Sequence, residues 1–107
     1  MKIIKRSGSE VSFDIQKIEA AIRSANESVL DYEKLEESQI QEILINVENA
    51  CSNMKRSPSV EEIQDMVENQ IMNQRAFTVA RNYITYRYRR ALIRKSNSTD
   101  EQILSLL

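Results

Sequence analysis

Three basic residues near the N-terminus are placed where they could bind a polyphosphate together. Lys5 and Arg6 precede a tight turn at Gly8, and Lys17 lies in the first turn of an expected helix. A short hairpin that runs directly into this helix would bring the three cations close together. With no glycine-rich loop to supply backbone amides, side chains must neutralise the phosphates. The alternative is that Lys5 and Arg6 only keep an edge strand soluble.

The composition excludes most other kinds of chemistry. With one glycine in 107 residues, the chain can contain neither a P-loop nor a dinucleotide-binding fingerprint. The absence of histidine excludes imidazole general bases and histidine-ligated metals. Cys51 alone forms neither an internal disulfide nor a zinc cluster, and its place in an apolar helical stripe predicts a core residue. We therefore expect no catalysis and no metal held by protein side chains within these residues.

Length and charge place the chain in a broad class. A chain of 107 residues is expected to form one domain. No stretch approaches the roughly 20 apolar residues of a membrane span, and the N-terminus is too mixed for a secretory signal, so we expect a cytoplasmic protein. The net charge of −1 is unevenly distributed: residues 27–48 hold seven acidic residues and one lysine, whereas residues 81–95 hold six basic residues and no acidic one. This asymmetry fits either an anionic partner or a solvated helix face.

The residue pattern predicts the elements that position the N-terminal cations. Residues 2–6 and 11–13 have the composition and alternation of short strands, and the single glycine between them suits the turn. Asp14 is a good N-cap for a helix. Apolar residues from Ile15 to Val29, at spacings of three and four, predict that first helix.

Two capping boxes mark the starts of the next two helices. Ser38 and Gln41 are expected to begin a second helix that continues to about Met54. The single proline, at position 58, breaks the chain, and a second box at positions 59–62 begins a third helix that carries an apolar stripe to Ile71. Residues 30–37 are acidic and aperiodic, which indicates a loop.

The last periodic segment predicts a fourth helix from Phe77 to about Lys95, ended by residues 96–99. The predicted fold is therefore mainly α with a small β cap (α+β), an N-terminal β-hairpin over a four-helix bundle. Residues 1–95 are expected to form the folded domain. Residues 96–107 are expected to be the start of a linker to a missing part of a longer chain, because their apolar end would be unusual as a free terminus.

Four segments carry a resemblance to a known family, in order and in spacing: residues 5–8, 13–18, 60–68 and 80–87. Together they resemble the ATP-cone, the nucleotide-sensing regulatory domain at the N-terminus of many ribonucleotide reductases. Residues 97–104 resemble the segment that follows the cone in the anaerobic, glycyl-radical ribonucleoside-triphosphate reductase. The resemblance implies an allosteric domain that binds ATP as activator or dATP as inhibitor, with Mg²⁺ held mostly by phosphates and water. It also implies two partners, a catalytic domain of the same polypeptide and possible homo-oligomers formed through the cone.

The resemblance further implies the roles of individual residues. The residues implied at the phosphates are Lys5, Arg6 and Lys17, with Arg87 or Arg89 reaching in from the fourth helix. The residues implied at the base and sugar are Phe13, Asp14, Ile18, Val60 and Gln64, the last two flanking the adenine. Two positions depart from the pattern of the family. The position that is often acidic in aerobic relatives is Val11 in this chain, and the position that is often threonine is Val60.

Two alternatives remain at this point. The run from Tyr86 to Arg90 could belong to a helical module that binds nucleic acid, although a net charge near zero and an acidic second helix argue against it. The chain could also be the cone of a nucleotide-responsive transcriptional repressor. Such repressors carry a Cys-rich zinc ribbon before the cone, whereas this chain starts directly at the hairpin.

Overall fold

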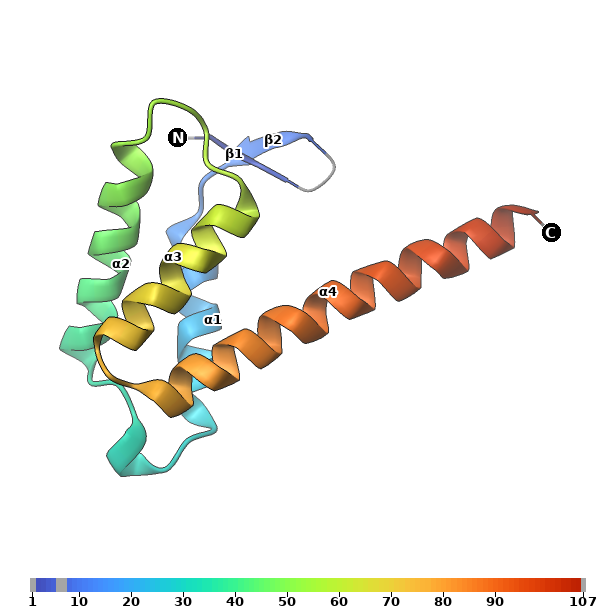
Figure 1. Ribbon diagram of the computed structural model, residues 1–107. Coiled ribbons are helices and arrows are strands. Elements are labelled where there is room, and N and C mark those ends of the chain that lie inside the picture. Colours follow the sequence, from blue (N-terminus) through green and yellow to red (C-terminus); the bar gives the residue numbers. More distant parts are fainter. Residues whose placement is uncertain (1, 6–7, 107) are drawn as a thin grey trace.

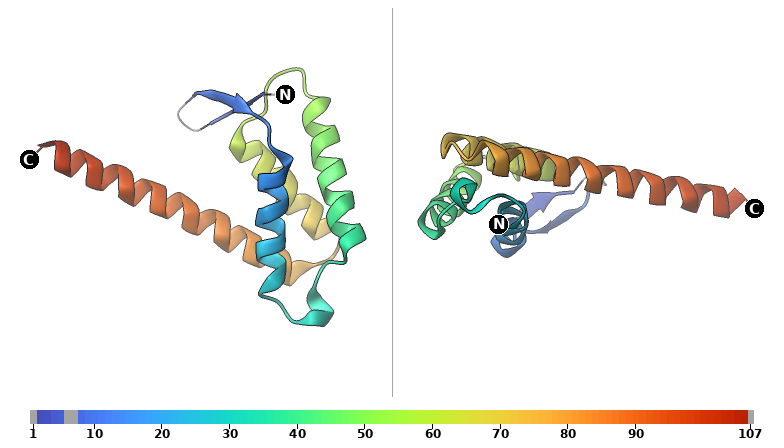
Figure 2. Two further views of the ribbon diagram at one scale, coloured as in Figure 1. Left: turned by 180° about the vertical axis from the view of Figure 1, so that it is seen from behind. Right: turned by 90° about the horizontal axis from the view of Figure 1, so that it is seen from below.

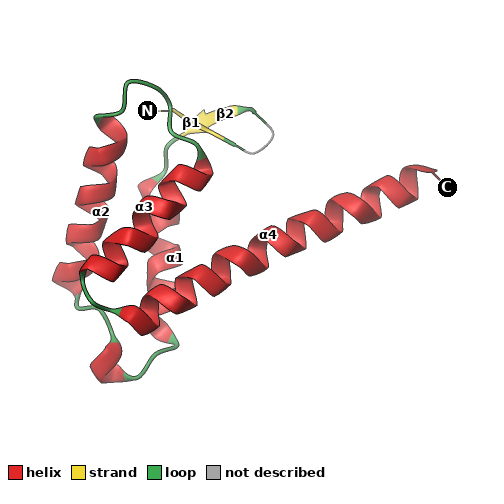
Figure 3. Ribbon diagram, in the orientation of Figure 1, coloured by secondary structure: helices red, strands yellow, loops and turns green. Residues whose placement is uncertain are grey.

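A computed structural model describes the backbone of residues 2–5 and 8–106, and the side chains of these ranges up to residue 93. Within these residues, a two-stranded hairpin lies over one end of an assembly of four α-helices (Figure 1). Helices dominate, and the hairpin is the single sheet of the described chain (Figure 3). The predicted fold class, mainly α with a small β cap, is confirmed.

The hairpin is attached to the entrance of the third helix. Strand β1 (Lys2–Ile4) pairs antiparallel with β2 (Glu10–Ser12), and Ile3 lies opposite Val11. Gly8 adopts a φ of 87° in the turn, a conformation that only glycine takes without strain. The Ile4 amide donates a hydrogen bond of 2.9 Å to the carbonyl of Pro58. This bond fixes the hairpin beside the start of α3.

The first helix follows the hairpin as predicted. Helix α1 (Ile15–Glu27) begins at Asp14, whose carboxylate accepts a hydrogen bond of 3.0 Å from the Gln16 amide. After α1, the chain makes one 3₁₀ turn, η1 (Asp31–Glu33). The Asn26 amide group braces this loop by exchanging two hydrogen bonds with the backbone of Leu35. The loop is therefore ordered by a side chain of the preceding helix.

The second helix begins earlier than predicted. Helix α2 (Glu37–Ser52) has Glu36 as its N-cap, and Glu36 and Gln39 form the capping box. The predicted box at Ser38 is wrong. The physical reason is that glutamate and glutamine can make the same reciprocal pair of bonds two residues earlier, including a 2.8 Å bond from the Glu36 amide to Gln39. A helix that starts there forms additional backbone hydrogen bonds.

The third helix has the start that the sequence predicts. Helix α3 (Val60–Asn73) is capped by Ser59, whose hydroxyl accepts a hydrogen bond of 3.1 Å from the Glu62 amide. The Glu62 carboxylate in turn accepts one of 3.1 Å from the Ser59 amide, which completes the predicted capping box. After α3, Arg75 takes a φ of 63° and its amide donates to the Met72 carbonyl. This left-handed residue ends the helix and turns the chain.

The fourth helix is longer than predicted. Helix α4 (Phe77–Leu106) continues past Lys95, so the predicted helix end at residues 96–99 is wrong. Residues 96–99 contain serine, asparagine and threonine but neither glycine nor proline, and each costs a helix only about 0.5 kcal/mol. Figure 2 shows α4 extending well beyond the other helices. Although α4 has 30 residues, no described helix has an apolar stretch long enough to cross a membrane.

One apolar core joins the four helices. Its least exposed side chains come from each of them: Ile22 from α1, Ile43 and Val47 from α2, Val67 and Ile71 from α3, and Val79 from α4. Cys51 is also buried, as predicted, and its Sγ lies 3.9 Å from the Met66 Sδ. Burial raises the pKa of this thiol, so Cys51 behaves as a small apolar residue.

Two exposed ion pairs make the stability of the fold sensitive to acid. The Arg56 guanidinium binds Glu62, and Arg23 binds Glu37, each through two hydrogen bonds. These arginines lower the pKa of both carboxyls from 4.5 to about 2. A folded-state pKa below the unfolded value means that the stabilisation is present above pH 4.5 and is lost as the pH falls toward 2.

We therefore expect the melting temperature to fall as the pH drops from about 4.5 to about 2. The melting temperature of the Glu37→Gln, Glu62→Gln double variant should fall less over this pH interval, because glutamine does not titrate and can still cap α3. Thermal melts followed by circular dichroism across the pH series measure this. An equal acid-induced loss in the wild type and the double variant would contradict the assignment.

Candidate functional site

A cleft of about 490 Å³ opens where the hairpin meets three helices. This volume lies within the range of small-molecule sites, about 300–1,000 Å³. The hairpin and the start of α1 contribute Ile3, Lys5, Val11, Ser12, Phe13, Asp14, Lys17, Ile18 and Ala21. Helices α3 and α4 contribute Val60, Ile63, Gln64, Tyr83, Tyr86, Arg87 and Arg90. The walls therefore come from segments that are far apart in the sequence.

Three lining cations give the cleft an excess of positive charge. Lys5, Lys17 and Arg90 come from the hairpin, α1 and α4, and each is exposed. Within the described part of the chain, none of the three side chains has a hydrogen-bond or ion-pair partner. Asp14 is the single carboxylate among the described lining residues, and it caps α1. The cleft can therefore neutralise an anion without breaking an existing contact.

The position of Lys17 is itself informative. Lys17 lies in the first turn of α1, where the helix dipole is positive and a basic residue is mildly unfavourable. An anion bound between this turn and Lys5 would be attracted by both the dipole and the two charges. The local electrostatics therefore favour a negatively charged ligand at this end of the cleft.

Another part of the cleft is apolar and is also lined by Gln64, a residue that carries an unpaired acceptor. Phe13, Ile18 and Val60 are half-buried and line this part together with Ile63 of the core. The Oε1 atom of Gln64 is buried and accepts no hydrogen bond from any described residue. A buried acceptor without a partner costs about 1–3 kcal/mol. A ligand that presents a flat apolar surface and a hydrogen-bond donor would fit here.

The structure brings together eight of the ten residues that the sequence predicts. The eight that line the cleft are Lys5, Phe13, Asp14, Lys17, Ile18, Val60, Gln64 and Arg87. Arg6 lies outside the described residues. Arg89 does not line the cleft but a separate hollow of about 280 Å³ between α1 and α4. Whether these residues bind a nucleotide stays a prediction.

Sequence reasoning missed three cleft residues on α4, namely Tyr83, Tyr86 and Arg90. Tyr86 and Arg90 line the cleft together with the buried Tyr83 and with Arg87. Positions 83, 86, 87 and 90 share one helix face, since they are separated by three or four residues. Arg89 is two residues from Arg87 and therefore points about 200° away around the helix. Helical periodicity would have distinguished Arg90 from Arg89, had it been applied to the basic run.

The buried tyrosine of this wall is fixed in the neutral form. Burial raises the pKa of the Tyr83 hydroxyl to about 12, with a smaller opposing effect from the nearby Arg87. Tyr83 is therefore un-ionised at neutral pH and adds no negative charge to the cleft. Of the three tyrosines in this stretch, Tyr83 belongs to the core, whereas Tyr86 and Tyr88 are exposed.

A β-hairpin over helices, and a cleft that combines cations unpaired among the described residues with an apolar recess, are features expected of a small binding domain for anionic ligands. Comparison with known proteins identifies the family. A family profile described as "ATP cone domain" matches residues 1–92. The chain therefore belongs to the ATP-cone family, whose members are nucleotide-binding regulatory domains.

Individual relatives are ribonucleotide reductases or a subunit of one. The chain is 32% identical over 108 residues to the ribonucleoside-diphosphate reductase subunit alpha of Chlamydia trachomatis, covering 94% of this chain and 10% of that protein. It is 37% identical over 99 residues to the vitamin B12-dependent ribonucleoside-diphosphate reductase of Thermoplasma acidophilum, covering 88% and 12%. It is 34% identical over 96 residues to the anaerobic ribonucleoside-triphosphate reductase of Haemophilus influenzae, covering 90% and 13%.

The chain thus spans about a tenth of the length of these relatives. The relatives belong to three kinds of ribonucleotide reductase, of which the anaerobic type named by the sequence resemblance is one.

Proposed function

We propose that this chain is an allosteric domain that binds ATP or dATP in the hairpin cleft and thereby controls ribonucleotide reduction by a longer reductase. Lys5 and Lys17 would contact the phosphates, together with Arg6. Phe13 and Ile18 would pack against the base and sugar. Mg²⁺ would accompany the phosphates and be held mostly by phosphate oxygens and water, because the described cleft offers only one carboxylate.

One observation carries the proposal: cations without a partner among the described residues line the same cleft as Gln64, whose buried Oε1 also has none. A simple anion would use only the cations Lys5 and Lys17. A simple apolar ligand would leave Gln64 Oε1 without a partner. A nucleotide satisfies both, since it carries phosphates at one end and a flat base with polar edges at the other.

Gln64 supports a preference for adenine over guanine. Its Oε1 requires a donor, and the exocyclic amine of adenine is one. Guanine has a carbonyl oxygen at the equivalent position, which would leave two acceptors facing each other. Rotating the Gln64 amide so that it donates to this guanine oxygen would bury the NH₂ group, which has two donors, at the place where the single acceptor Oε1 now lies. Val60 and Ile63 lie on the same helix and would flank the ring.

Helix α4 offers a route from the cleft to the rest of a reductase. Tyr83, Tyr86 and Arg90 line the cleft, and the helix continues to residue 106, away from the other helices (Figure 2). A ligand can shift a conformational equilibrium only by its differential affinity for the two states. We propose that ATP and dATP place α4 or the hairpin differently and so change contacts with a catalytic domain of the same polypeptide, or self-association. A cytoplasmic location and an anaerobic type of reductase belong to the same proposal.

Calorimetric titration of the domain with Mg²⁺ and ATP, dATP or GTP tests this function. We expect ATP and dATP to bind, and GTP to bind about 10-fold more weakly or worse, since an unsatisfied acceptor costs about 1–3 kcal/mol. The Gln64→Leu variant should reduce the ratio between ATP and GTP affinity. Light scattering on the longer reductase chain, with saturating ATP and then dATP, extends the test to regulation.

Several outcomes would contradict the proposal. Equal affinity for GTP would remove the assignment to adenine nucleotides. Steady release of inorganic phosphate from ATP would show that the domain is not purely regulatory. Identical masses of the longer chain with ATP and dATP, together with identical hydrogen-exchange protection along α4, would overturn the regulatory mechanism.

A further inference from the structure

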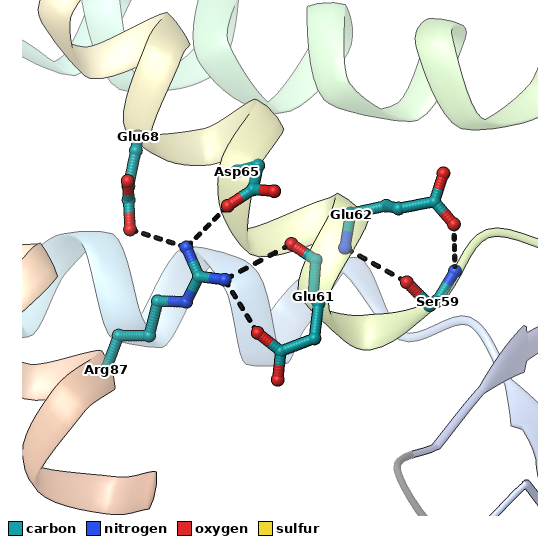
Figure 4. A network of polar contacts seen from close by, with 6 residues as sticks. All are labelled: Ser59, Glu61, Glu62, Asp65, Glu68 and Arg87. Carbon is teal, nitrogen blue, oxygen red and sulfur yellow. Dashed lines mark hydrogen bonds and ion pairs between the residues drawn. The ribbon is translucent and has the colours of Figure 1, made fainter.

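Arg87 differs from the other cleft cations because its guanidinium is already engaged. Its Nη1 atom lies 2.7 Å from Asp65 Oδ1 and 2.6 Å from Glu68 Oε1. Its Nη2 atom lies 2.7 Å from Glu61 Oε2 and 3.4 Å from the Glu61 carbonyl oxygen. Figure 4 shows the side chain reaching from α4 to these three acidic residues, which all belong to α3. One arginine therefore connects two walls of the cleft.

The pair between Arg87 and Glu68 is the most shielded part of this network. The exposed fractions of these two side chains are 17% and 18%, whereas those of Glu61 and Asp65 are 43% and 63%. Exposed ion pairs contribute little to stability, but breaking a shielded pair leaves an uncompensated charge. Glu68 is therefore the partner expected to matter most, and Asp65 the least.

Little donor capacity remains on Arg87 for a ligand. A guanidinium has five N–H groups, and the four on Nη1 and Nη2 face acceptors of α3. Burial works against the charged form, but the hydrogen bonds to the three acids outweigh it and raise the pKa of Arg87 above its ordinary value. A phosphate approaching the group would meet three carboxylates around one cation and be repelled.

Arg90 is in the opposite situation. It lies three residues further along α4, on the same helix face, and lines the same cleft. It is exposed, and among the described residues its side chain has no ion-pair or hydrogen-bond partner. Its guanidinium can form two parallel bonds to a phosphate without giving up an existing interaction.

We propose that Arg87 is a positioning residue that clamps α4 to α3, and that Arg90 supplies the contact between α4 and the phosphates. The clamp then sets the separation between the α3 wall of the cleft, with Gln64 and Val60, and the α4 wall, with Tyr86. The assignment of Arg90 rests on the proposed nucleotide-binding function. The clamp itself does not, and it can be tested in the ligand-free domain.

The experiment compares melting temperature and nucleotide affinity in four variants. Glu68→Gln and Arg87→Lys weaken the clamp while preserving size or charge, and we expect each to lower the melting temperature by about 5–15 °C. ATP and AMP affinities should then fall by a similar factor, because the cleft wall is displaced while the side chains that bind the phosphates are unchanged. Arg81→Lys, which changes an exposed arginine outside the network, is the matched control and should leave both readouts near the wild type. Asp65→Asn removes the most exposed of the three acids and should shift the melting temperature less than Glu68→Gln.

Arg90→Gln should lower nucleotide affinity without lowering stability, in contrast to the clamp variants Glu68→Gln and Arg87→Lys. We expect an unchanged melting temperature and a loss of ATP affinity of about 10- to 150-fold, with a much smaller loss for AMP, since a charge-assisted bond to the outer phosphates is removed. A double-mutant cycle between Arg87→Lys and Glu68→Gln should give strongly non-additive shifts in melting temperature.

For Arg87, a role as a clamp and a role as a phosphate ligand make opposite predictions for the Glu68→Gln variant. If Arg87 were a phosphate ligand restrained by the acids, this variant would free it and raise the affinity for ATP relative to AMP. That result, or an Arg87→Lys variant that melts like the wild type and loses only ATP affinity, would overturn the clamp. Failure of the wild type to bind ATP would instead contradict the proposed function. The double-mutant cycle in melting temperature would still test whether Arg87 clamps α4 to α3.

Discussion

Replacing Lys5 or Lys17 with alanine is expected to weaken ATP binding by about 1.5–3 kcal/mol each, which is about 10- to 150-fold in Kd. Both lysines line the cleft without a partner among the described residues, so the only interactions removed are those with the ligand. In the double variant the losses should add only in part, because both residues neutralise the same anion. Calorimetric titration with ATP and AMP measures the effect, and the loss should be larger for ATP.

Stability provides the internal control for these variants. Alanine at position 5 should leave the melting temperature unchanged, and Lys17→Ala should leave it unchanged or slightly higher, since a cation is removed from the positive end of α1. Lys55→Ala changes an exposed lysine outside the cleft and should affect neither readout. A steep drop in melting temperature with unchanged affinity would show that Lys5 and Lys17 have a structural role.

Truncating Ile43 to alanine is expected to destabilise the domain by about 2–5 kcal/mol, the range for a large-to-small change in a packed core. Ile43 has 0% exposure and packs in the core shared by the four helices. In a domain of this size, such a loss lowers the melting temperature by about 4–8 °C per kcal/mol. Denaturant titration and thermal melts measure it.

The matched control lies two residues away on the same helix. Ile45 has 57% exposure, so Ile45→Ala makes the same chemical change without opening a cavity. We expect a change within about 0.5 kcal/mol, and alanine has the higher helix propensity. Neither residue lines the cleft, so nucleotide affinity below the melting transition should be unchanged in both. Similar stability losses at the two positions would mean that the core is not packed as described.

Local signals in the sequence predicted most of the fold. Asp14, Gly8 and the box of Ser59 with Glu62 act over a few residues, so their roles follow from composition and spacing alone. The two errors came from ambiguity of the same kind. Two capping boxes competed at the start of α2, and residues 96–99 have only weak helix-breaking character. In each case the sequence did contain a signal, but small local differences in free energy decided where the helix begins or ends.

The sequence by itself determined the elements, the apolar stripes and the convergence of Lys5 and Lys17, because a hairpin that leads directly into a helix leaves little freedom. Only the tertiary structure decided which side chains remain free. Helical periodicity separates Arg89, which lines another hollow, from Arg87 and Arg90. Arg87 and Arg90 share one helix face, yet one is bound by acids of α3 and the other lines the cleft without a partner among the described residues. The acidic residues of α3 are 19 to 26 positions before Arg87 in the chain. Which arginine they neutralise depends on how α3 and α4 pack against each other, and no local pattern contains that information.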